Sequence, residues 1–476
     1  MKLFDEVWLE IFEALTLKDL LRCNLVCKQF YKVINTNRIW KPLCEVDLAE
    51  RTERFFDFSW TFAVPCRWKL CYLKQKVARN WTSDKFKSFP LKLPFSQPVD
   101  ILTYNGEVLV VKSEDKLQAY LVHVHDHYAD RIALEEKPKP SYKSLLTNTL
   151  YLIVNNGKYL LVYRFNEVCG KYQTDYAYYV VNNQKFIHYV HEEGSNRRLN
   201  EYEDLVGRAD LELLTFLGNT LYLAFGNVTD RQDGKGTYCI CAFNLETMQY
   251  LLEVKVQSYS WTSDQKIIYL LETFDQTVPF AQLCCYDEHG VEIYRRDRDY
   301  TILNIYVNYH ILLAVKHILF EQFTIKIEYN VLEKATGREL YSNQIRRSND
   351  SRINSVDTTK LMPSADIVLI NVDYKHGCGS LNCDCPPNKA FVLYDLAQAT
   401  LIHTIRFWTN RLLLGADRYL LDPYCTGNIK HEVYDFLKDT YARISAPGRL
   451  VYAAYDLLVI RNYYKKVSSL SVQVYS

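Results

Sequence analysis

Two segments, CAFNLETMQYL (residues 241–251) and FVLYDLAQATLIHTI (residues 391–405), share one arrangement that decides the fold of most of the chain. In each, an apolar run ends in an aromatic residue followed by Asn or Asp, and a short stretch leads into a second apolar run. Short apolar runs separated by turn residues are typical of β-strands. The Asn or Asp side chain bonds its own backbone two residues on and so begins a turn. Each segment therefore predicts two strands joined by a tight turn.

This aromatic-Asn/Asp pair recurs along the chain. Six copies are in phase, at Phe165-Asn166, Phe243-Asn244, Tyr286-Asp287, Tyr329-Asn330, Tyr394-Asp395 and Tyr434-Asp435. Their separations are 78, 43, 43, 65 and 40 residues. A blade of a four-stranded propeller takes about 40 to 45 residues, so the two long intervals carry extra loops of roughly 35 and 22 residues. Tyr120 and Tyr475 continue the phase at the two ends, which gives eight marks.

The period favours a large all-β propeller over a sandwich, because a repeat architecture shows itself as a fixed step. We predict eight blades, with seven as the alternative if one weak unit is an insertion. The last blade would lack its fourth strand, and Leu91 to Pro98 could supply it and close the ring. The two quoted segments also resemble the final strand pair of WD repeats, although the chain has no Trp-Asp dipeptide. The resemblance implies a divergent WD-like propeller.

Composition limits the class of protein. The 476 residues are 48% apolar and 24% charged, with only 16 Gly and 13 Pro, which excludes a disordered or collagen-like chain. The 38 Tyr and 22 Phe suit half-buried sheets. A net charge of +1 gives no electrostatic footprint for nucleic acid or an anionic membrane. Without a signal sequence or membrane span, we expect a protein of the cytoplasm or nucleus whose 14 Cys are reduced.

The first forty residues have a helical pattern instead. Trp8, Ile11, Phe12 and Leu15 recur at the spacing of one helix face. Thr16 and Asp19 form a capping-box-like start for a second helix, and a third follows through about Asn35. The surplus of apolar positions on the third helix predicts a partner, since a unit of this size buries little surface alone. A plain three-helix domain that uses these residues only for its own core is the alternative.

Residues 3–40, LFDEVWLEIFEALTLKDLLRCNLVCKQFYKVINTNRIW, resemble the F-box motif. The positions that match the family pattern are Leu3, Glu6, Val7, Ile11, Phe12, Leu15, Asp19, Leu20, Leu21, Val26, Cys27 and Trp40. Phe4 stands where the family usually has Pro, and Phe30 where it has Trp. The resemblance implies docking onto the small adaptor of a Skp-cullin-F-box ubiquitin ligase. It implies that the adaptor is bound by Leu3, Phe4, Val7, Ile11, Phe12, Leu15, Leu20, Leu21, Val26 and Cys27.

A further amphipathic helix is predicted from Cys66 to Trp81, and it is similar to the linker of F-box proteins that continue into a WD-repeat propeller. There an Asn-Trp pair, here Asn80-Trp81, precedes the first strand. The chain is thus divided into an F-box (1–48), a helical linker (49–90) and a WD-like propeller (91–476).

Arginines recur where the fourth strand of a predicted blade would end. They are Arg295, Arg296, Arg298, Arg346, Arg347, Arg352, Arg406 and Arg443. In WD-like propellers the loops that join one blade to the next line the substrate face, so the side chains could converge at its centre. Guanidinium groups pair with phosphate in a bidentate manner, which suits a phosphorylated or acidic peptide. Solvated turn charge is the alternative, because Asp297, Asp299 and Asp350 are interleaved.

Metal sites have weaker support in the sequence. His376, Cys378, Cys383 and Cys385 could provide four zinc ligands, but the spacing lacks paired C-x-x-C knuckles and favours a surface loop with reduced thiols. His123, His125 and His127 alternate as on one strand face, where an exposed strand end is the preferred interpretation. Cys239, Cys241, Cys284 and Cys285 lie in apolar strands and are expected to be buried structural thiols.

The sequence contains no nucleophile elbow, phosphate loop, HExxH motif or dinucleotide fingerprint, so we expect a non-catalytic protein without a cofactor. The resemblance implies a substrate-recognition subunit that holds a protein substrate on its propeller while the F-box engages the adaptor, cullin and RING subunits. The alternative is an F-box/propeller scaffold that acts outside a ligase.

Overall fold

The computed structural model describes much of the chain between residues 5 and 475. The described residues are 5–43, 72, 76–77, 79–83, 85–91, 100–104, 108–113, 116–123, 128–134, 144–147, 151–155, 159–166, 171–181, 185–189, 210–226, 238–247, 249–264, 266–273, 280–299, 302, 304–308, 311–321, 324–347, 353–362, 366–374, 389–405, 413–415, 418–422, 430–446, 448–454, 456–462 and 469–475. Among them, no helix has the length and apolar character that crossing a membrane requires.

The N-terminal module is a group of short helices: α1 (Asp5–Glu13), α2 (Leu17–Cys23), α3 (Lys28–Ile34), α4 (Asn37–Trp40) and the 3-10 turn η1 (Lys41–Leu43). Thr16 caps α2, because its hydroxyl oxygen accepts the Asp19 backbone N–H at 3.3 Å. The predicted capping start is therefore confirmed. Phe12, Leu20, Val33, Ile34, Ile39 and Trp40 form a small buried core.

Trp40 and Phe30 organise this small core. The Trp40 side chain is fully buried, and its Nε1 donates a hydrogen bond to the Ile34 carbonyl at 2.8 Å. The Phe30 ring lies 4.4 Å from that of Trp8 and 5.0 Å from that of Phe12, measured between ring centres. Phe30 therefore fills an aromatic position in the core, which explains why Phe is tolerated where the F-box pattern has Trp.

Strands make up the rest of the described chain. The first half contains β1 (Lys87–Pro90), β2 (Asp100–Tyr104), β3 (Val108–Ser113), β4 (Lys116–His123), β5 (Tyr128–Leu134), β6 (Ser144–Thr147), β7 (Tyr151–Asn155), β8 (Tyr159–Asn166), β9 (Lys171–Val181), β10 (Lys185–Tyr189), β11 (Asp210–Leu217), β12 (Thr220–Gly226), β13 (Tyr238–Asn244), β14 (Gln249–Val256), β15 (Ser258–Ser263), β16 (Ile268–Thr273), β17 (Phe280–Tyr286) and β18 (Glu292–Asp299).

The second half contains β19 (Asn304–Val307), β20 (Ile311–Glu321), β21 (Thr324–Glu333), β22 (Glu339–Arg347), β23 (Ile353–Leu361), β24 (Ile367–Tyr374), β25 (Lys389–Asp395), β26 (Thr400–Ile405), β27 (Leu413–Gly415), β28 (Tyr419–Leu421), β29 (Lys430–Asp435), β30 (Thr440–Ser445), β31 (Arg449–Ala453), β32 (Leu457–Asn462) and β33 (Ser469–Val474).

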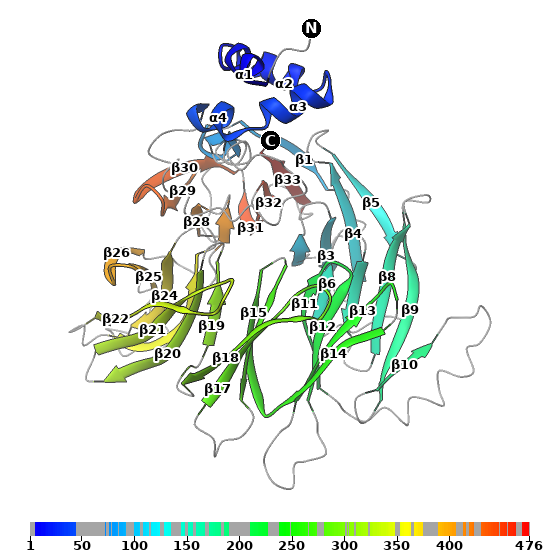
Figure 1. Ribbon diagram of the computed structural model, residues 1–476, viewed down its shortest axis with the longest axis vertical. Coiled ribbons are helices and arrows are strands. Elements are labelled where there is room, and N and C mark those ends of the chain that lie inside the picture. Colours follow the sequence, from blue (N-terminus) through cyan, green and yellow to red (C-terminus); the bar gives the residue numbers. More distant parts are fainter. Residues whose placement is uncertain are drawn as a thin grey trace.

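These strands form a β-propeller of eight four-stranded antiparallel units, counted over the described residues. Blades 1 to 7 are β2–β5, β6–β9, β11–β14, β15–β18, β19–β22, β23–β26 and β27–β30, and blade 8 is β31–β33 with β1. A short parallel pairing of β5 with β9 joins blades 1 and 2 into one sheet, to which β10 adds a further strand. The sheets surround a common axis, and the first strands of neighbouring blades contact one another (Figure 1). The eight-blade prediction agrees with this topology, whereas seven blades would leave one unit unused.

The ring is closed by an early strand, as predicted, but by a different one. β1 pairs antiparallel with β33, with Lys87 opposite Val474 and Pro90 opposite Ser471. The Leu91 backbone N–H adds a hydrogen bond to the Leu470 carbonyl at 3.0 Å. The prediction of Leu91 to Pro98 for this strand is wrong in its position, because the strand that pairs with β33 is Lys87–Pro90. Residues 92–98 lie outside the described residues.

Most of the apolar core lies between blades. Seven of the buried clusters formed by the described residues each join two neighbouring blades, in sequence from blades 2 and 3 round to blades 8 and 1. Within β16, Ile268 and Leu270 face blade 3, and Tyr269 and Leu271 face blade 5. Because both faces of such a strand are buried, it is apolar at consecutive positions and not only at alternate ones.

The periodic aromatic-Asn/Asp marks lie in the third strand of each blade or directly after it. Their turn chemistry is as predicted: the Asn244 Oδ1 accepts the backbone N–H groups of Glu246 and Thr247, both at 2.9 Å. Asp287 does the same for His289 at 2.8 Å. The third strand therefore carries the repeat that is visible in the sequence, since it combines a buried strand with the turn into the fourth strand.

Tyrosine hydroxyls also hold one blade to the next. The Tyr222 hydroxyl, in blade 3, donates to the Asp287 carbonyl in blade 4 at 2.6 Å. The Tyr329 hydroxyl, in blade 5, donates to the Leu396 carbonyl in blade 6 at 2.7 Å. Both rings are buried, so each bond joins a second or third strand to the turn of the following blade.

We expect Tyr329→Phe to lower the free energy of unfolding by about 1 to 3 kcal/mol, because the Leu396 carbonyl loses this donor. Tyr222→Phe should cost less, about 0.5 to 1.5 kcal/mol, because the Asp287 carbonyl still accepts the Gly290 backbone N–H at 3.1 Å. Urea denaturation followed by circular dichroism measures the change. Tyr441→Phe is the control, because the Tyr441 side chain is 57% exposed. Removal of its hydroxyl should change the free energy of unfolding by less than about 0.5 kcal/mol. Equal stability of all three variants and wild type would show that these hydroxyls do not hold the blades.

The linker connects the helical module to the ring. Residues 72, 76–77 and 79–82 are helical, in agreement with the C-terminal part of the predicted helix, and residues 66–71 lie outside the described residues. Tyr72 packs on the helical module, with its ring 5.7 Å from that of Trp40. Trp81 packs between blades 7 and 8. The module accordingly lies at the edge of the ring near β1, β30 and the C-terminus (Figure 1).

Candidate functional site

The predicted adaptor-binding residues divide into an exposed and a buried group. Val7, Ile11, Leu21, Val26 and Cys27 are exposed. Phe12 and Leu20 are only 1% and 2% exposed, and Leu15 is half-buried against the same core. These three side chains pack in or against the core that holds the helices together. Leu3 and Phe4 lie outside the described residues.

Exposed large apolar side chains are concentrated on the helical module. Thirteen large apolar side chains are exposed among the described residues, and seven of them lie in residues 5–43. Five of the seven lie on α1, α2 or the turn that follows α2; we call Val7, Ile11, Leu21, Leu25 and Val26 the apolar helix residues. Leu25 is the most exposed, at 86%. Concentrated exposure of apolar side chains is typical of a protein-interaction site.

The cap of α3 links this exposed turn to the helices. The Cys27 thiol sulfur accepts the Phe30 backbone N–H at 3.4 Å, in the place that Ser, Thr or Asp usually takes. Cys27 therefore both begins α3 and lies beside the exposed side chains of Leu25 and Val26. The sequence implied contact with the adaptor at this position, and the structure adds the capping role.

The predicted arginine cluster is not placed as expected. Arg295, Arg296, Arg298 and Arg443 lie within fourth strands, β18 and β30, and Arg346 and Arg347 are the last residues of the fourth strand β22. The fourth strand is the outermost of each blade, so these residues lie at the rim and not around the axis. Arg352 and Arg406 lie outside the described residues.

Four of these arginines already have protein partners, and one of them is Arg443, which donates to Glu432 Oε1 at 3.2 Å. Arg295 forms an ion pair with Glu292 at 2.7 Å and donates to Gln282 Oε1 at 2.7 Å. Arg296 donates to the Thr336 carbonyl at 3.1 Å, and Arg298 donates to the Gly337 carbonyl. Because Thr336 and Gly337 belong to the turn of blade 5, the last two bonds hold blade 4 against blade 5. These arginines therefore serve the ring itself.

The buried carboxyl of Glu272 lies beside Arg295. Burial raises the pKa of Glu272 above its ordinary value, and the Arg295 guanidinium, 3.8 Å away, opposes that rise. The Tyr286 hydroxyl also lies 3.1 Å from an Arg295 nitrogen. Arg295 is thus committed to a partly buried network inside blade 4, which leaves little of its hydrogen-bonding capacity for a bound peptide.

The proposed metal ligands are not tested by the structure. His376, Cys378, Cys383 and Cys385 lie outside the described residues, as do His125 and His127. No group of three or more metal-binding side chains occurs within the described part of the chain. Cys239, Cys241, Cys284 and Cys285 are all at most 1% exposed, which confirms the prediction of buried thiols, and the sulfur atoms of Cys239 and Cys241 lie 3.6 Å apart.

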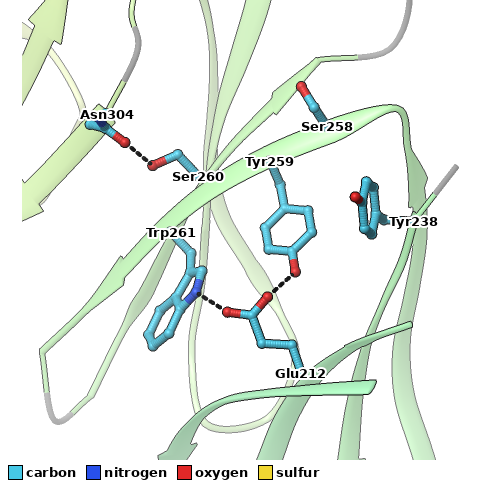
Figure 2. Close-up of a pocket in the computed structure, with 7 residues that line it drawn as sticks. All are labelled: Glu212, Tyr238, Ser258, Tyr259, Ser260, Trp261 and Asn304. Carbon is cyan, nitrogen blue, oxygen red and sulfur yellow. Dashed lines mark hydrogen bonds between the residues drawn. The ribbon is translucent and has the colours of Figure 1, made fainter. Parts of the chain in front are cut away.

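A pocket that the sequence did not predict opens on the inner wall of the ring. It has a volume of about 450 Å³ and is formed mainly by the first strands of blades 3, 4 and 5. We call it the channel pocket; it is lined by Glu212, Tyr238, Ser258, Tyr259, Ser260, Trp261 and Asn304. Figure 2 shows these side chains gathered around β15.

Glu212 is the centre of the hydrogen bonding in the channel pocket. The Tyr259 hydroxyl donates to its Oε2 at 2.5 Å, and the Trp261 Nε1 donates to its Oε1 at 3.4 Å (Figure 2). Tyr238 packs edge-on against Tyr259, with ring centres 5.2 Å apart. Burial, followed by the hydrogen bond to Glu212, raises the pKa of the Tyr259 hydroxyl, which therefore stays protonated and remains a donor.

Both sides of β15 contribute to the channel pocket because side chains alternate along a strand. Tyr259 and Trp261 extend toward Glu212 of blade 3, and Ser260 lies 3.5 Å from the Asn304 side chain of blade 5. Two signals in the sequence could have indicated this site: SYSWTS alternates hydroxyl and aromatic residues, and DLELLTFL carries Glu212 inside an apolar run. Neither signal shows that the two segments are neighbours.

One comparison with known proteins matches the helical module. The F-box-like family matches residues 5–46. No curated protein matches the chain.

Solved structures with a likeness to the chain are distant in sequence. Hsv2 from Kluyveromyces lactis is 10% identical over 73% of this chain and 97% of its own, with a TM-score of 0.39. Hydrazine synthase from Kuenenia stuttgartiensis is 11% identical over 71% and 96%, with a TM-score of 0.36. An assembly of Saccharomyces cerevisiae Dbp5 with Nup159 and Gle1 gives 8% identity over 79% and 98%, with a TM-score of 0.36. These low values carry no functional argument.

Proposed function

We propose that the chain is a substrate-recognition subunit of a Skp-cullin-F-box ubiquitin ligase, acting in the cytoplasm or nucleus. The observation that carries the proposal is the set of apolar helix residues on a module that matches the F-box-like family. An adaptor that covers these side chains removes them from water, which stabilises the complex. The propeller then holds a protein substrate for ubiquitination and degradation.

The packing of the linker supports separate roles for the helical module, which would bind the adaptor, and the ring, which would bind the substrate. Tyr72 belongs to the core of the helical module, and Trp81 to the core between blades 7 and 8, so the segment from Tyr72 to Trp81 is packed on the module at one end and on the ring at the other. A substrate on the ring is therefore held at a defined place relative to the adaptor. The contribution of the chain to ubiquitin transfer is proximity and orientation, and it needs neither a catalytic group nor a cofactor of its own.

A scaffold that acts outside a ligase is the alternative function. Affinity capture of the full chain from cells treated with a proteasome inhibitor distinguishes the two, because a ligase subunit retains the adaptor, a cullin and a RING subunit together. Capture of the adaptor without a cullin favours the scaffold. Failure to retain the adaptor overturns the proposal.

A further inference from the structure

We propose that the channel pocket binds an arginine side chain presented by a protein substrate. This inference rests on the proposed role of the ring as a substrate receptor, and it names the chemistry that the receptor recognises. The walls of the pocket come from three consecutive blades, mainly from their first strands β11, β15 and β19. The charge, the aromatic surface and the acceptor groups of the pocket all suit one guanidinium group.

The charge of the pocket is negative. Glu212 is the only charged residue among the seven that line it, and within the described residues its carboxylate forms no ion pair. Both of its oxygen atoms accept a neutral donor, from Tyr259 and Trp261, which fixes their position without cancelling the charge. A carboxylate has about four acceptor positions, so one on each oxygen is left for a ligand. Two acceptors side by side match the two parallel N–H groups of arginine.

The aromatic rings favour a cation of the same kind. Tyr238, Tyr259 and Trp261 are half-buried. Tyr259 and Trp261 contact the Glu212 carboxylate, and Tyr238 packs against Tyr259. The face of an aromatic ring attracts a cation, and a planar guanidinium also stacks on it. An anionic phosphate would meet the Glu212 charge and the ring faces, both of which repel it. The channel pocket is thus opposite in charge to the phosphopeptide site that the sequence suggested.

Hydrogen-bond donors distinguish arginine from other cations at the Glu212 carboxylate. Arginine has five N–H donors and can give two of them to the free acceptor positions of Glu212, whereas a trimethylated lysine has no donor at all. We therefore assign the pocket to a guanidinium group and not to a quaternary ammonium group.

Fluorescence anisotropy with the purified full chain tests the assignment. The probe is a short dye-labelled peptide, capped at both ends, with one central arginine; matched peptides carry citrulline, trimethyl-lysine or phosphoserine at the same place. Citrulline keeps the shape of arginine and removes its charge. We expect the arginine peptide to bind roughly tenfold more tightly than the citrulline peptide, and more tightly than the other two.

Glu212→Gln should remove that preference, because it keeps an acceptor for Tyr259 and loses the charge. Glu246→Gln is the matched control, since Glu246 is an exposed carboxylate of the same blade that lies in the turn between β13 and β14. Equal binding of the arginine and citrulline peptides, tighter binding of phosphoserine, or no binding at all would each overturn the assignment. The assay contains no adaptor, so its result is independent of whether the chain acts in a ligase.

Discussion

Ile11→Asp is expected to weaken binding of the Skp-type adaptor by roughly a hundredfold or more. The Ile11 side chain is 41% exposed on α1, one turn after Val7, which is 37% exposed. In the proposed complex both are covered by the adaptor. Aspartate would lose the gain from burying the side chain, about 1.5 to 3 kcal/mol, and would also bring an unpaired carboxylate into an apolar interface. The measurement is isothermal titration of the purified adaptor into the full chain.

Ile293→Asp is the matched control for this experiment. Ile293 lies on the outer strand β18 and is 45% exposed, so it has the same chemistry and a similar exposure to Ile11, but on the ring. Its replacement should leave adaptor affinity unchanged. Circular dichroism should show that both variants keep the wild-type strand and helix content. If Ile11→Asp binds the adaptor as tightly as wild type, the apolar helix residues are not the docking surface.

Much of the ring follows from the sequence because its third strands have a strong local pattern. A mark such as Phe243-Asn244 combines a buried aromatic residue with an Asn that begins the next turn, and both properties depend on the residue and its neighbours alone. The count of eight blades follows from the spacing of such marks. The buried thiols are predictable for the same reason, since Cys284 and Cys285 lie inside an apolar run.

The errors concern strands whose residues are polar. β18 reads EIYRRDRD, and most of its described side chains are exposed because it is the outer strand of blade 4. A strand with a solvated outer face resembles a turn in the sequence, which is why Arg295, Arg296 and Arg298 were expected in a loop. β1 reads KSFP and is held by backbone bonds to β33, which no side-chain pattern reveals. Pro90 is tolerated there because β1 lies at a sheet edge.

The channel pocket could not be predicted because it depends on long-range neighbours. Glu212, Tyr259 and Asn304 are each about one blade apart in the sequence and meet only when the first strands surround the axis. Within its own strand, each of these residues is an ordinary polar side chain that does not indicate a binding site. The pocket arises from the closure of the ring, so a change in the residues that secure that closure would affect the proposed binding of arginine as well as stability.

Trp81 is central to that closure, and Trp81→Ala is expected to lower the free energy of unfolding of the ring by about 3 to 5 kcal/mol. The side chain is fully buried between blades 7 and 8. Its ring stacks on Tyr475 with centres 4.4 Å apart, and it lies 6.1 Å from Tyr419. Alanine would leave a cavity at the point where the linker enters the ring. Urea denaturation followed by far-ultraviolet circular dichroism measures the loss.

The close approach of Gly415 to the Trp81 ring allows a double-mutant test of this contact. A Cβ atom at Gly415 would lie 2.3 Å from the Trp81 ring, so only glycine allows the indole to sit against β27. Gly415→Ala alone should therefore destabilise the ring by about 1 to 3 kcal/mol. Combined with Trp81→Ala, the new methyl group enters vacated space, and the double variant should be more stable than the sum of the single losses predicts by about 1 to 2 kcal/mol. Simple additivity would show that the two residues are not in contact. Adaptor affinity should stay unchanged in all three variants, because the core of the helical module contains Tyr72 and not Trp81.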